Sequence, residues 1–274
     1  MPPSEPEPRR LCLITGASAG IGAAFARIYA SHGYDLALTA RREERLTQIA
    51  DDIALRYGGE TLVIPADLSD PQAIDHILGH IADHGRQVAA LVNNAGYGLT
   101  GAYTSLAWPA QAAMLQVMLT AVCELTHKVM PGMVHRRFGR IVNVASLAGL
   151  VPGYPGQTLY GPIKAFLVRL SEVLHMENLD TGVHVTALCP GFTYSEFHDV
   201  NHTRRELEQR TPAWMWLGAD EVAAAGYEAA EANRPICVTG APNKAIAALS
   251  KIVPDEWAMA LMSMDHGAMG RRGR

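Results

Sequence analysis

Short apolar runs recur along the chain and alternate with longer stretches of helical periodicity. The runs have the length of buried strands, and they occupy residues 11–14, 35–39, 62–64, 89–92, 139–145, 182–189 and 235–239. Apolar side chains fall on one helical face in 21–29, and further helices are predicted at 70–84, at 109–135 and around 160–164. This alternation predicts an α/β fold, a doubly wound parallel sheet of about seven strands with helices on both faces.

A glycine-rich turn, Thr15 to Gly22 (TGASAGIG), joins the first predicted strand to the first predicted helix. Backbone N–H groups at a helix start are unpaired and the helix dipole adds partial positive charge, so such a turn can bind a phosphate. Gly16 permits the tight turn, while Gly20 and Gly22 allow a pyrophosphate and the neighbouring strand to approach the backbone. This context favours a Rossmann-like dinucleotide site over the alternative, a tight turn that binds nothing.

The end of the second predicted strand indicates which dinucleotide binds. In this fold an acid at that place holds the ribose hydroxyls of NAD, whereas an arginine favours the 2′-phosphate of NADP. Here Thr39 and Ala40 occupy the place of the acid, and Arg41 and Arg42 follow. Because a guanidinium pairs well with phosphate, we expect NADP(H) as the cofactor. The alternative is that the sequence RREER only begins a solvated helix.

Composition and charge argue against a nucleic-acid-binding or membrane-spanning protein. Hydrophobic residues make up 49% of the 274 residues, enough for a large core, and the net charge is −4. Lys and Arg form no basic stripe, so nothing supports a nucleic-acid partner, and no apolar run approaches the ~20 residues of a transmembrane segment. We expect residues 1–10, which include four prolines, to be a disordered tail, and residues 11–274 to form a single domain.

Cysteine and histidine positions give little sign of metal or redox chemistry. No CxxC pair occurs among the cysteines, which are Cys12, Cys123, Cys189 and Cys237. Buried, reduced thiols are the expected state, consistent with a cytoplasmic location. Three histidines stand four residues apart on one predicted helix: His76, His80 and His84. No neighbouring Cys or paired carboxylate completes a metal site there, so we expect a solvated helix face and no metal.

Four motifs in a fixed order resemble the signatures of the short-chain dehydrogenase/reductase family. They are the TGxxxGxG spacing of the glycine-rich turn, NNAG at residues 93–96, Ser146 with a YxxxK motif 14 residues later, and PGFTYS at residues 190–195, where the family has PGxxxT. Tyr160 and Lys164 of the YxxxK motif share one helical face. Ser146 follows a predicted strand at its carboxyl end, where ligands bind in open parallel sheets. The resemblance covers about residues 11–195.

The resemblance implies roles for the matching residues. Ser146, Tyr160 and Lys164 are the implied catalytic residues. Asp67 and Leu68 are expected to contact the adenine, and the backbone of Thr193 to meet the nicotinamide carboxamide. Together with the two arginines, the cofactor-binding residues that we expect are Gly16, Ser18, Gly20, Ile21, Gly22, Arg41, Arg42, Asp67, Leu68, Asn94, Ala95, Gly96, Tyr160, Lys164, Pro190, Gly191, Thr193 and Ser195.

These residue types suit the transfer of a hydride to a carbonyl. A ketone oxygen becomes an alkoxide as its carbon gains hydride, and it then needs a proton and hydrogen bonds. Tyr160 can supply the proton if the positive charges of Lys164 and of the oxidised nicotinamide lower its pKa from the ordinary value of ~10. The Ser146 hydroxyl holds the carbonyl oxygen. The expected substrate is therefore a small-molecule carbonyl or the corresponding secondary alcohol.

Two other functions fit parts of the pattern. A catalytically weak NADP(H)-binding regulatory or scaffold protein would keep the fold, but the intact Ser146, Tyr160 and Lys164 argue against it. A sugar-nucleotide epimerase or dehydratase of the longer related group is disfavoured by the glycine spacing and by the lack of a substantial substrate domain.

Two residues depart from the family's pattern. Pro162 lies within the YxxxK motif and has no N–H to donate; with Thr158 as the N-cap, we expect one intrahelical bond to be lost. The family's usual helix asparagine falls on Met118, in LQVMLTAV. The resemblance implies that this asparagine holds a local helix distortion and a water that reprotonates the active-site lysine. Because a thioether is a poor acceptor and no donor, either a water bound to backbone carbonyls suffices or the proton supply takes another route. We expect a slowed proton relay and retained catalysis.

The long connection at residues 191–218 is predicted to be a substrate lid. It carries several large apolar side chains: Phe192, Tyr194, Phe197, Trp214, Met215 and Trp216. Residues 246–262 add apolar surface. The functional interpretation is an apolar pocket for a lipophilic carbonyl compound, and the alternative is plain core or a subunit contact. We also expect a homo-oligomer, either a dimer or a tetramer.

Overall fold

The computed structural model describes residues 9–153, 155–196, 211–254, 256–257 and 259. Arg10 belongs to the fold, because its carbonyl accepts the N–H of Asp35 at 2.9 Å and its guanidinium lies 3.7 Å from the centre of the Phe138 ring. The carbonyl of Arg9 accepts a hydrogen bond from Arg86. The predicted tail therefore extends too far by these two residues, and its remaining part, residues 1–8, lies outside the described residues.

A parallel sheet of seven strands forms the centre of the molecule, in the order β3-β2-β1-β4-β5-β6-β9. Each apolar run that is predicted to be a strand forms one, and the observed ends differ from the predicted ends by no more than one residue. The strands are β1 (Leu11–Thr15), β2 (Asp35–Ala40), β3 (Thr61–Pro65), β4 (Val88–Asn93), β5 (Gly139–Val144), β6 (Val183–Cys189) and β9 (Ile236–Val238). A second sheet, not predicted, pairs β7 (Thr193–Tyr194) with β8 (Leu217–Gly218).

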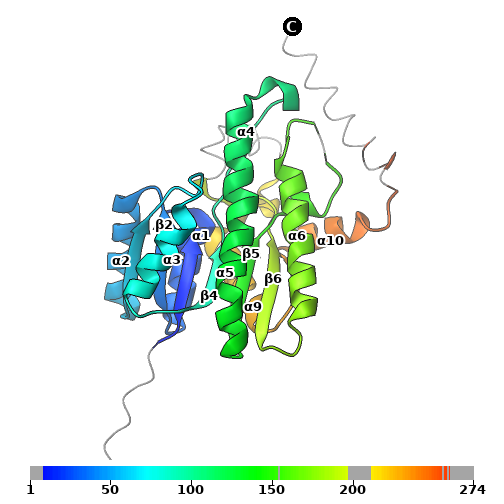
Figure 1. Ribbon diagram of the computed structural model, residues 1–274. Coiled ribbons are helices and arrows are strands. Elements are labelled where there is room, and N and C mark those ends of the chain that lie inside the picture. The colour runs from blue at the N-terminus through cyan, green and yellow to red at the C-terminus, as the bar shows by residue number, and fades with distance from the viewer. Residues whose placement is uncertain (1–8, 154, 197–210, 255, 258, 260–274) are drawn as a thin grey trace, which may run out of the picture.

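Helices cover both faces of the central sheet (Figure 1). Helices α1, α2 and α9 pack on one face, and α3, α5 and α6 on the other. The helices are α1 (Gly20–Ser31), α2 (Glu43–Tyr57), α3 (Ala73–Asp83), α4 (Trp108–Leu115), α5 (Ala121–His135), α6 (Tyr160–Glu177), α9 (Ala219–Glu231) and α10 (Ala241–Leu249). Successive β1 residues alternate between the two cores, with Leu11 and Leu13 in one and Cys12 and Ile14 in the other. A strand buried on both faces reads as a continuous apolar run, as expected of a parallel sheet.

The strand order reverses between β1 and β4. From β1 the chain continues to β2 and β3 on one side, and then returns to β4 on the other side of β1. This reversal opens a crevice at the carboxyl ends of the two strands, the usual ligand site of doubly wound sheets. The glycine-rich turn follows β1, and Asn94 follows β4, so both lie at this switch point.

One predicted helix start is wrong, and one predicted helix is interrupted within its bounds. The residue before α3 is Gln72, not Asp70; the Asp70 carboxylate instead accepts the N–H of Gln72 within the preceding turn. The helix predicted at 109–135 is interrupted by a π-helical segment, Gln116–Thr120, between α4 and α5. Hydrophobic periodicity does not reveal a single wide turn inside an otherwise regular helix.

The structure also bears on the cysteines, on membrane-spanning helices and on metal-ligating clusters. Cys12, Cys189 and Cys237 are buried free thiols, as predicted, while Cys123 is half-buried. None of the helices within the described ranges has the length and apolarity that crossing a bilayer requires. Over the same ranges, His, Cys, Asp and Glu side chains form no cluster of three that could hold a metal ion.

Candidate active site

The glycine-rich turn adopts the geometry that its sequence predicts. Gly16 and Gly20 have positive φ angles of 64° and 54°, a region that glycine enters without strain. Gly22 also needs its missing side chain, because a Cβ there would lie 2.3 Å from the Gly16 carbonyl oxygen. Helix α1 begins at Gly20, and its N-cap residue, Ala19, provides no side-chain cap. The helix start therefore presents backbone N–H groups and the positive end of its dipole, the two features that hold a phosphate.

Side-chain hydrogen bonds join this turn to the end of β4. The Asn94 side chain donates to the carbonyl oxygens of Thr15 and Gly16, at 3.0 and 3.1 Å. The Thr15 hydroxyl accepts the backbone N–H groups of Asn94 and Ala95, both at 3.0 Å. The next residue, Gly96, packs against Met118, because a Cβ on Gly96 would lie 3.2 Å from the end of the Met118 side chain. Asn94, Ala95 and Gly96 therefore line the switch point, and the Thr15 hydroxyl is a structural partner that sequence reasoning missed.

The two arginines after β2 have different neighbours. Arg42 Nη2 donates to the Ser18 hydroxyl of the glycine-rich turn at 3.0 Å and to the Glu196 carboxylate at 2.7 Å. Arg41 instead faces Asp67 after β3, whose pKa is lowered mainly by a hydrogen bond from the Ser69 N–H and, to a smaller extent, by Arg41. This arrangement places a cation beside the glycine-rich turn.

The remaining predicted cofactor residues are distributed around the same edge. Leu68 is mostly buried in the core beside β3, and Ile21 is partly buried on α1. After β6, Pro190 accepts the Leu147 N–H through its carbonyl at 2.9 Å, and Thr193 is buried. Ser195 packs on the glycine-rich turn, since a Cβ on Gly20 would lie 2.9 Å from Ser195 Cβ.

The predicted catalytic residues meet at the carboxyl end of β5. Ser146 follows β5, and its hydroxyl accepts the Ala148 N–H at 3.1 Å. The short turn after it packs on α6, because a Cβ on Gly149 would lie 2.6 Å from the Lys164 carbonyl group. Lys164 Nζ lies 5.5 Å from the centre of the Tyr160 ring. Sequence order and tertiary packing therefore bring all three residues to one edge.

Lys164 is an almost fully buried cation. Its side chain is 5% exposed, and Nζ donates to the Val144 carbonyl oxygen at 2.7 Å. Burial penalises the charged form and lowers the pKa of Lys164 to about 8. A pKa close to neutral pH suits a group that exchanges protons during a reaction. Burial also raises the pKa of the neighbouring Cys189 thiol to about 12, so this thiol is neutral at physiological pH.

The start of α6 differs from the prediction. Thr158 is not the N-cap; it has a φ of 48°, which is strained for a β-branched residue. The helix begins at Tyr160 after Leu159, and its first intrahelical bond runs from the Ile163 N–H to the Leu159 carbonyl. Pro162 therefore occupies the third helical position, where an N–H has no intrahelical partner. No helix bond is lost, contrary to the prediction of one.

A helix distortion lies at Met118, although the asparagine to which the resemblance attributes such a distortion is absent. Gln116–Thr120 is π-helical, with the Ala121 N–H bonded to the Gln116 carbonyl. Met118 lies inside this segment and is 1% exposed. The wide turn thus forms without the asparagine side chain that the family has at this position.

The two ends of the predicted lid are joined. β7 pairs with β8, and Trp216 stacks on Tyr194 with ring centres 5.0 Å apart and lies 5.3 Å from Phe192. Trp214 is exposed, and Phe197 lies outside the described residues, as does the rest of 197–210.

The apolar residues of the C-terminal region, 246–262, have plain core as one interpretation. That interpretation is wrong for four side chains that are exposed: Leu249, Ile252, Trp257 and Met259.

Comparisons with known proteins agree with this architecture. A sequence profile of the short chain dehydrogenase family matches residues 10–206. The chain is 37% identical over 195 residues to "Sulfoacetaldehyde reductase 2" of Chromohalobacter salexigens, which covers 68% of this chain and 74% of that protein. The chain is a member of the short-chain dehydrogenase/reductase family. It is therefore an oxidoreductase of the type that acts on alcohol and carbonyl groups.

Solved structures of the family support a nicotinamide cofactor. A short-chain dehydrogenase from Sphingobium yanoikuyae in complex with NADPH superposes with a TM-score of 0.77 at 28% identity, covering 95% of each chain. A family member from Burkholderia phymatum in complex with NAD gives a TM-score of 0.78 at 27% identity, covering 88% of this chain and 92% of that one. The glycine cradle and the uncapped start of α1 fit such a dinucleotide.

Proposed function

We propose that the protein is an NADP(H)-dependent reductase of bulky lipophilic carbonyl compounds and oxidises the corresponding secondary alcohols. The observation that carries the cofactor assignment is the bond from Arg42 to Ser18, which holds a guanidinium against the phosphate-binding turn. A guanidinium there can pair with a 2′-phosphate. No acid occupies the end of β2, where NAD-binding proteins of this fold carry one to hold the ribose hydroxyls.

The chain's own residues divide the chemistry between them. When bound, the nicotinamide supplies or accepts the hydride. The Ser146 hydroxyl hydrogen-bonds the carbonyl oxygen as negative charge develops there, and Tyr160 donates the proton that completes the alcohol. Lys164 supports Tyr160 with its nearby positive charge and binds the nicotinamide ribose. Its lowered pKa, about 8, lets it release and regain a proton at little cost near neutral pH.

The aromatic cluster at the base of the lid supports a lipophilic substrate. Phe192, Tyr194 and Trp216 gather directly after β6, on the side of the sheet where the carboxyl ends lie. Apolar and aromatic side chains line most small-molecule pockets and favour ligands with apolar surface. A sulfonated aldehyde, the substrate named for one relative, would instead need a cation at this place.

A substrate panel tests the proposal. NADPH oxidation is followed at 340 nm with aryl and alicyclic ketones, and with sulfoacetaldehyde as the small polar comparison. We expect kcat/KM for the bulky ketones to exceed that for sulfoacetaldehyde by at least ~10-fold, the scale on which apolar pockets discriminate. Reduction of only small polar carbonyls would refute the lipophilic pocket. Equal dissociation constants for NADPH and NADH would refute the cofactor assignment.

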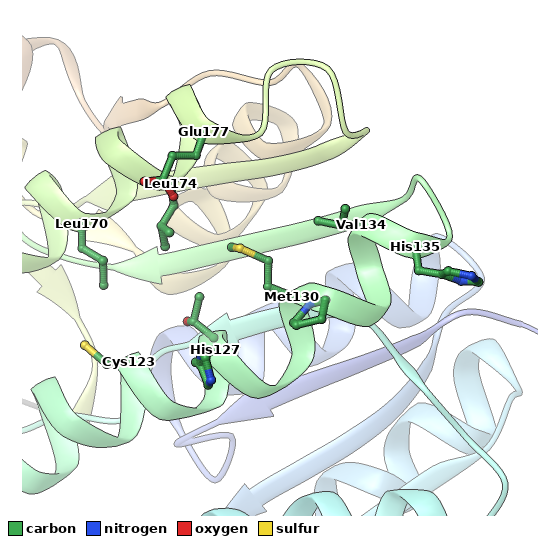
Figure 2. A pocket seen from close by; sticks show the side chains of 10 residues that line it. Cys123, His127, Met130, Val134, His135, Leu170, Leu174 and Glu177 are labelled. Carbon is green, nitrogen blue, oxygen red and sulfur yellow. The ribbon is translucent and has the colours of Figure 1, made fainter.

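We further propose that the protein acts in the cytoplasm as a homo-oligomer. An apolar groove of about 640 Å³ lies between α5 and α6, lined by Met130 and Val134 on one helix and Leu170 and Leu174 on the other (Figure 2). Exposed apolar side chains, Val173 and Met176 among them, extend the same surface along α6. A second copy of the chain would cover both features, and light scattering during gel filtration measures the number of copies.

A further inference from the structure

The Arg42 side chain has two partners on one nitrogen. Nη2 donates to the Ser18 hydroxyl at 3.0 Å and to Glu196 Oε2 at 2.7 Å. A guanidinium Nη carries two hydrogens, so both donors of this nitrogen are engaged. The ion pair joins two positions 154 residues apart in the chain. Ser195 fixes this approach, because it packs on Gly20, where no side chain intervenes.

We propose that Glu196 is a cofactor-specificity residue that competes with the 2′-phosphate of NADP(H) for Arg42. The proposal rests on the NADP(H) function given above. The carboxylate and a phosphate are both acceptor groups that the guanidinium binds through the same N–H groups. A phosphate that approaches the Ser18 side of Arg42 meets a donor already paired and a negative charge beside it. Glu196 therefore lowers affinity for NADP(H) and has little effect on NAD(H), which has no 2′-phosphate.

The exposure of the Arg42 and Glu196 side chains sets how much Glu196 weakens NADPH binding. The Arg42 and Glu196 side chains are 49% and 40% exposed, so water screens their attraction and the ion pair is weak. Releasing Arg42 from such a pair should lower the dissociation constant of NADPH by about two- to fivefold. Repulsion between the carboxylate and the phosphate acts in the same direction, and both effects weaken as salt is added.

Isothermal titration of NADPH and NADH into the intact protein tests this proposal without relying on turnover. Glu196→Gln keeps the side-chain shape and removes the charge. The matched control is Glu44→Gln, which removes an exposed carboxylate from the first turn of α2, two residues beyond Arg42. We expect Glu196→Gln to tighten NADPH about two- to fivefold, with NADH unchanged and with a smaller change in the control.

Three results would overturn the proposal. If Glu44→Gln tightens NADPH as much as Glu196→Gln does, the general charge of the surface is responsible. If Glu196→Gln weakens NADH, the carboxylate serves as an acceptor for a ribose hydroxyl. A second comparison uses the Arg42→Gln background, where the effect of Glu196→Gln on NADPH should shrink; an undiminished effect would show that Glu196 does not act through Arg42.

Failure of the proposed function gives a different result. The preference for NADP(H) is judged from the two dissociation constants of the unmodified protein, and it fails if NADH binds as tightly as NADPH. The role of Glu196 is judged from the change in the NADPH dissociation constant between variant and unmodified protein. Either can fail while the other holds.

Discussion

Replacing Lys164 by methionine should remove activity and make the protein more stable near neutral pH. The lysine is buried, and its ammonium donates a hydrogen bond to the Val144 carbonyl. Keeping a charge in this place opposes folding, and its pKa falls from the ordinary 10.5 to about 8 for that reason. Methionine has a similar length and no charge to desolvate.

The pH dependence gives the sign and size of the effect. Below about pH 8 the lysine is charged in both the folded and the unfolded chain; between about 8 and 10.5 the folded chain binds fewer protons. The free energy of unfolding therefore rises with pH across this window. The full rise corresponds to about 3 kcal/mol, of which about 2 kcal/mol falls between ~pH 7 and ~pH 9.5. The methionine variant lacks this rise.

Urea denaturation measures the free energy of unfolding of the unmodified protein and of Lys164→Met at both pH values. The quantity of interest is how much the difference between the two proteins changes with pH. Other titrating groups cancel because they are present in both proteins. We expect the stability of the unmodified protein, relative to Lys164→Met, to increase by about 2 kcal/mol between ~pH 7 and ~pH 9.5. The matched control is Lys251→Met, at an exposed lysine after α10, which should show no such increase. An equal difference at both pH values would refute the lowered pKa and, with it, the proton-exchange role.

Two further substitutions test the catalytic assignment. Tyr160→Phe should leave NADPH binding close to normal and reduce turnover by at least ~10²-fold, the scale of general acid catalysis; near-normal turnover in a steady-state assay would assign the proton to another group. Met118→Asn should leave turnover unchanged or raise it, with a smaller solvent isotope effect if the relay was limiting. It should also cost about 1–3 kcal/mol in urea denaturation, because it puts an amide in a buried apolar place; loss of an existing activity would show that Met118 shapes the site.

Much of the fold and of the candidate site could be predicted because the responsible interactions are local in the sequence. The glycine spacing predicts the turn, since a positive φ at Gly16 and the 2.3 Å approach at Gly22 allow no side chain. Continuous apolar runs predict strands buried on both faces, and the four-residue spacing of Tyr160 and Lys164 places them on one side of a helix. These features depend on backbone sterics and on burial pattern, which neighbouring residues determine.

Tertiary structure decided the features that depend on distant partners. Lys164 is buried in the fold with its Nζ against the Val144 carbonyl at the end of β5, and this burial lowers its pKa. Thr158 adopts a strained conformation ahead of α6 and the N-cap is Leu159, so the preference of Thr158 for a cap position has no effect. The pairing of Arg42 with Glu196 brings together positions 154 residues apart. Strand order and loop packing determine which distant side chains meet. Because these contacts depend on the tertiary arrangement, no local sequence pattern predicts them.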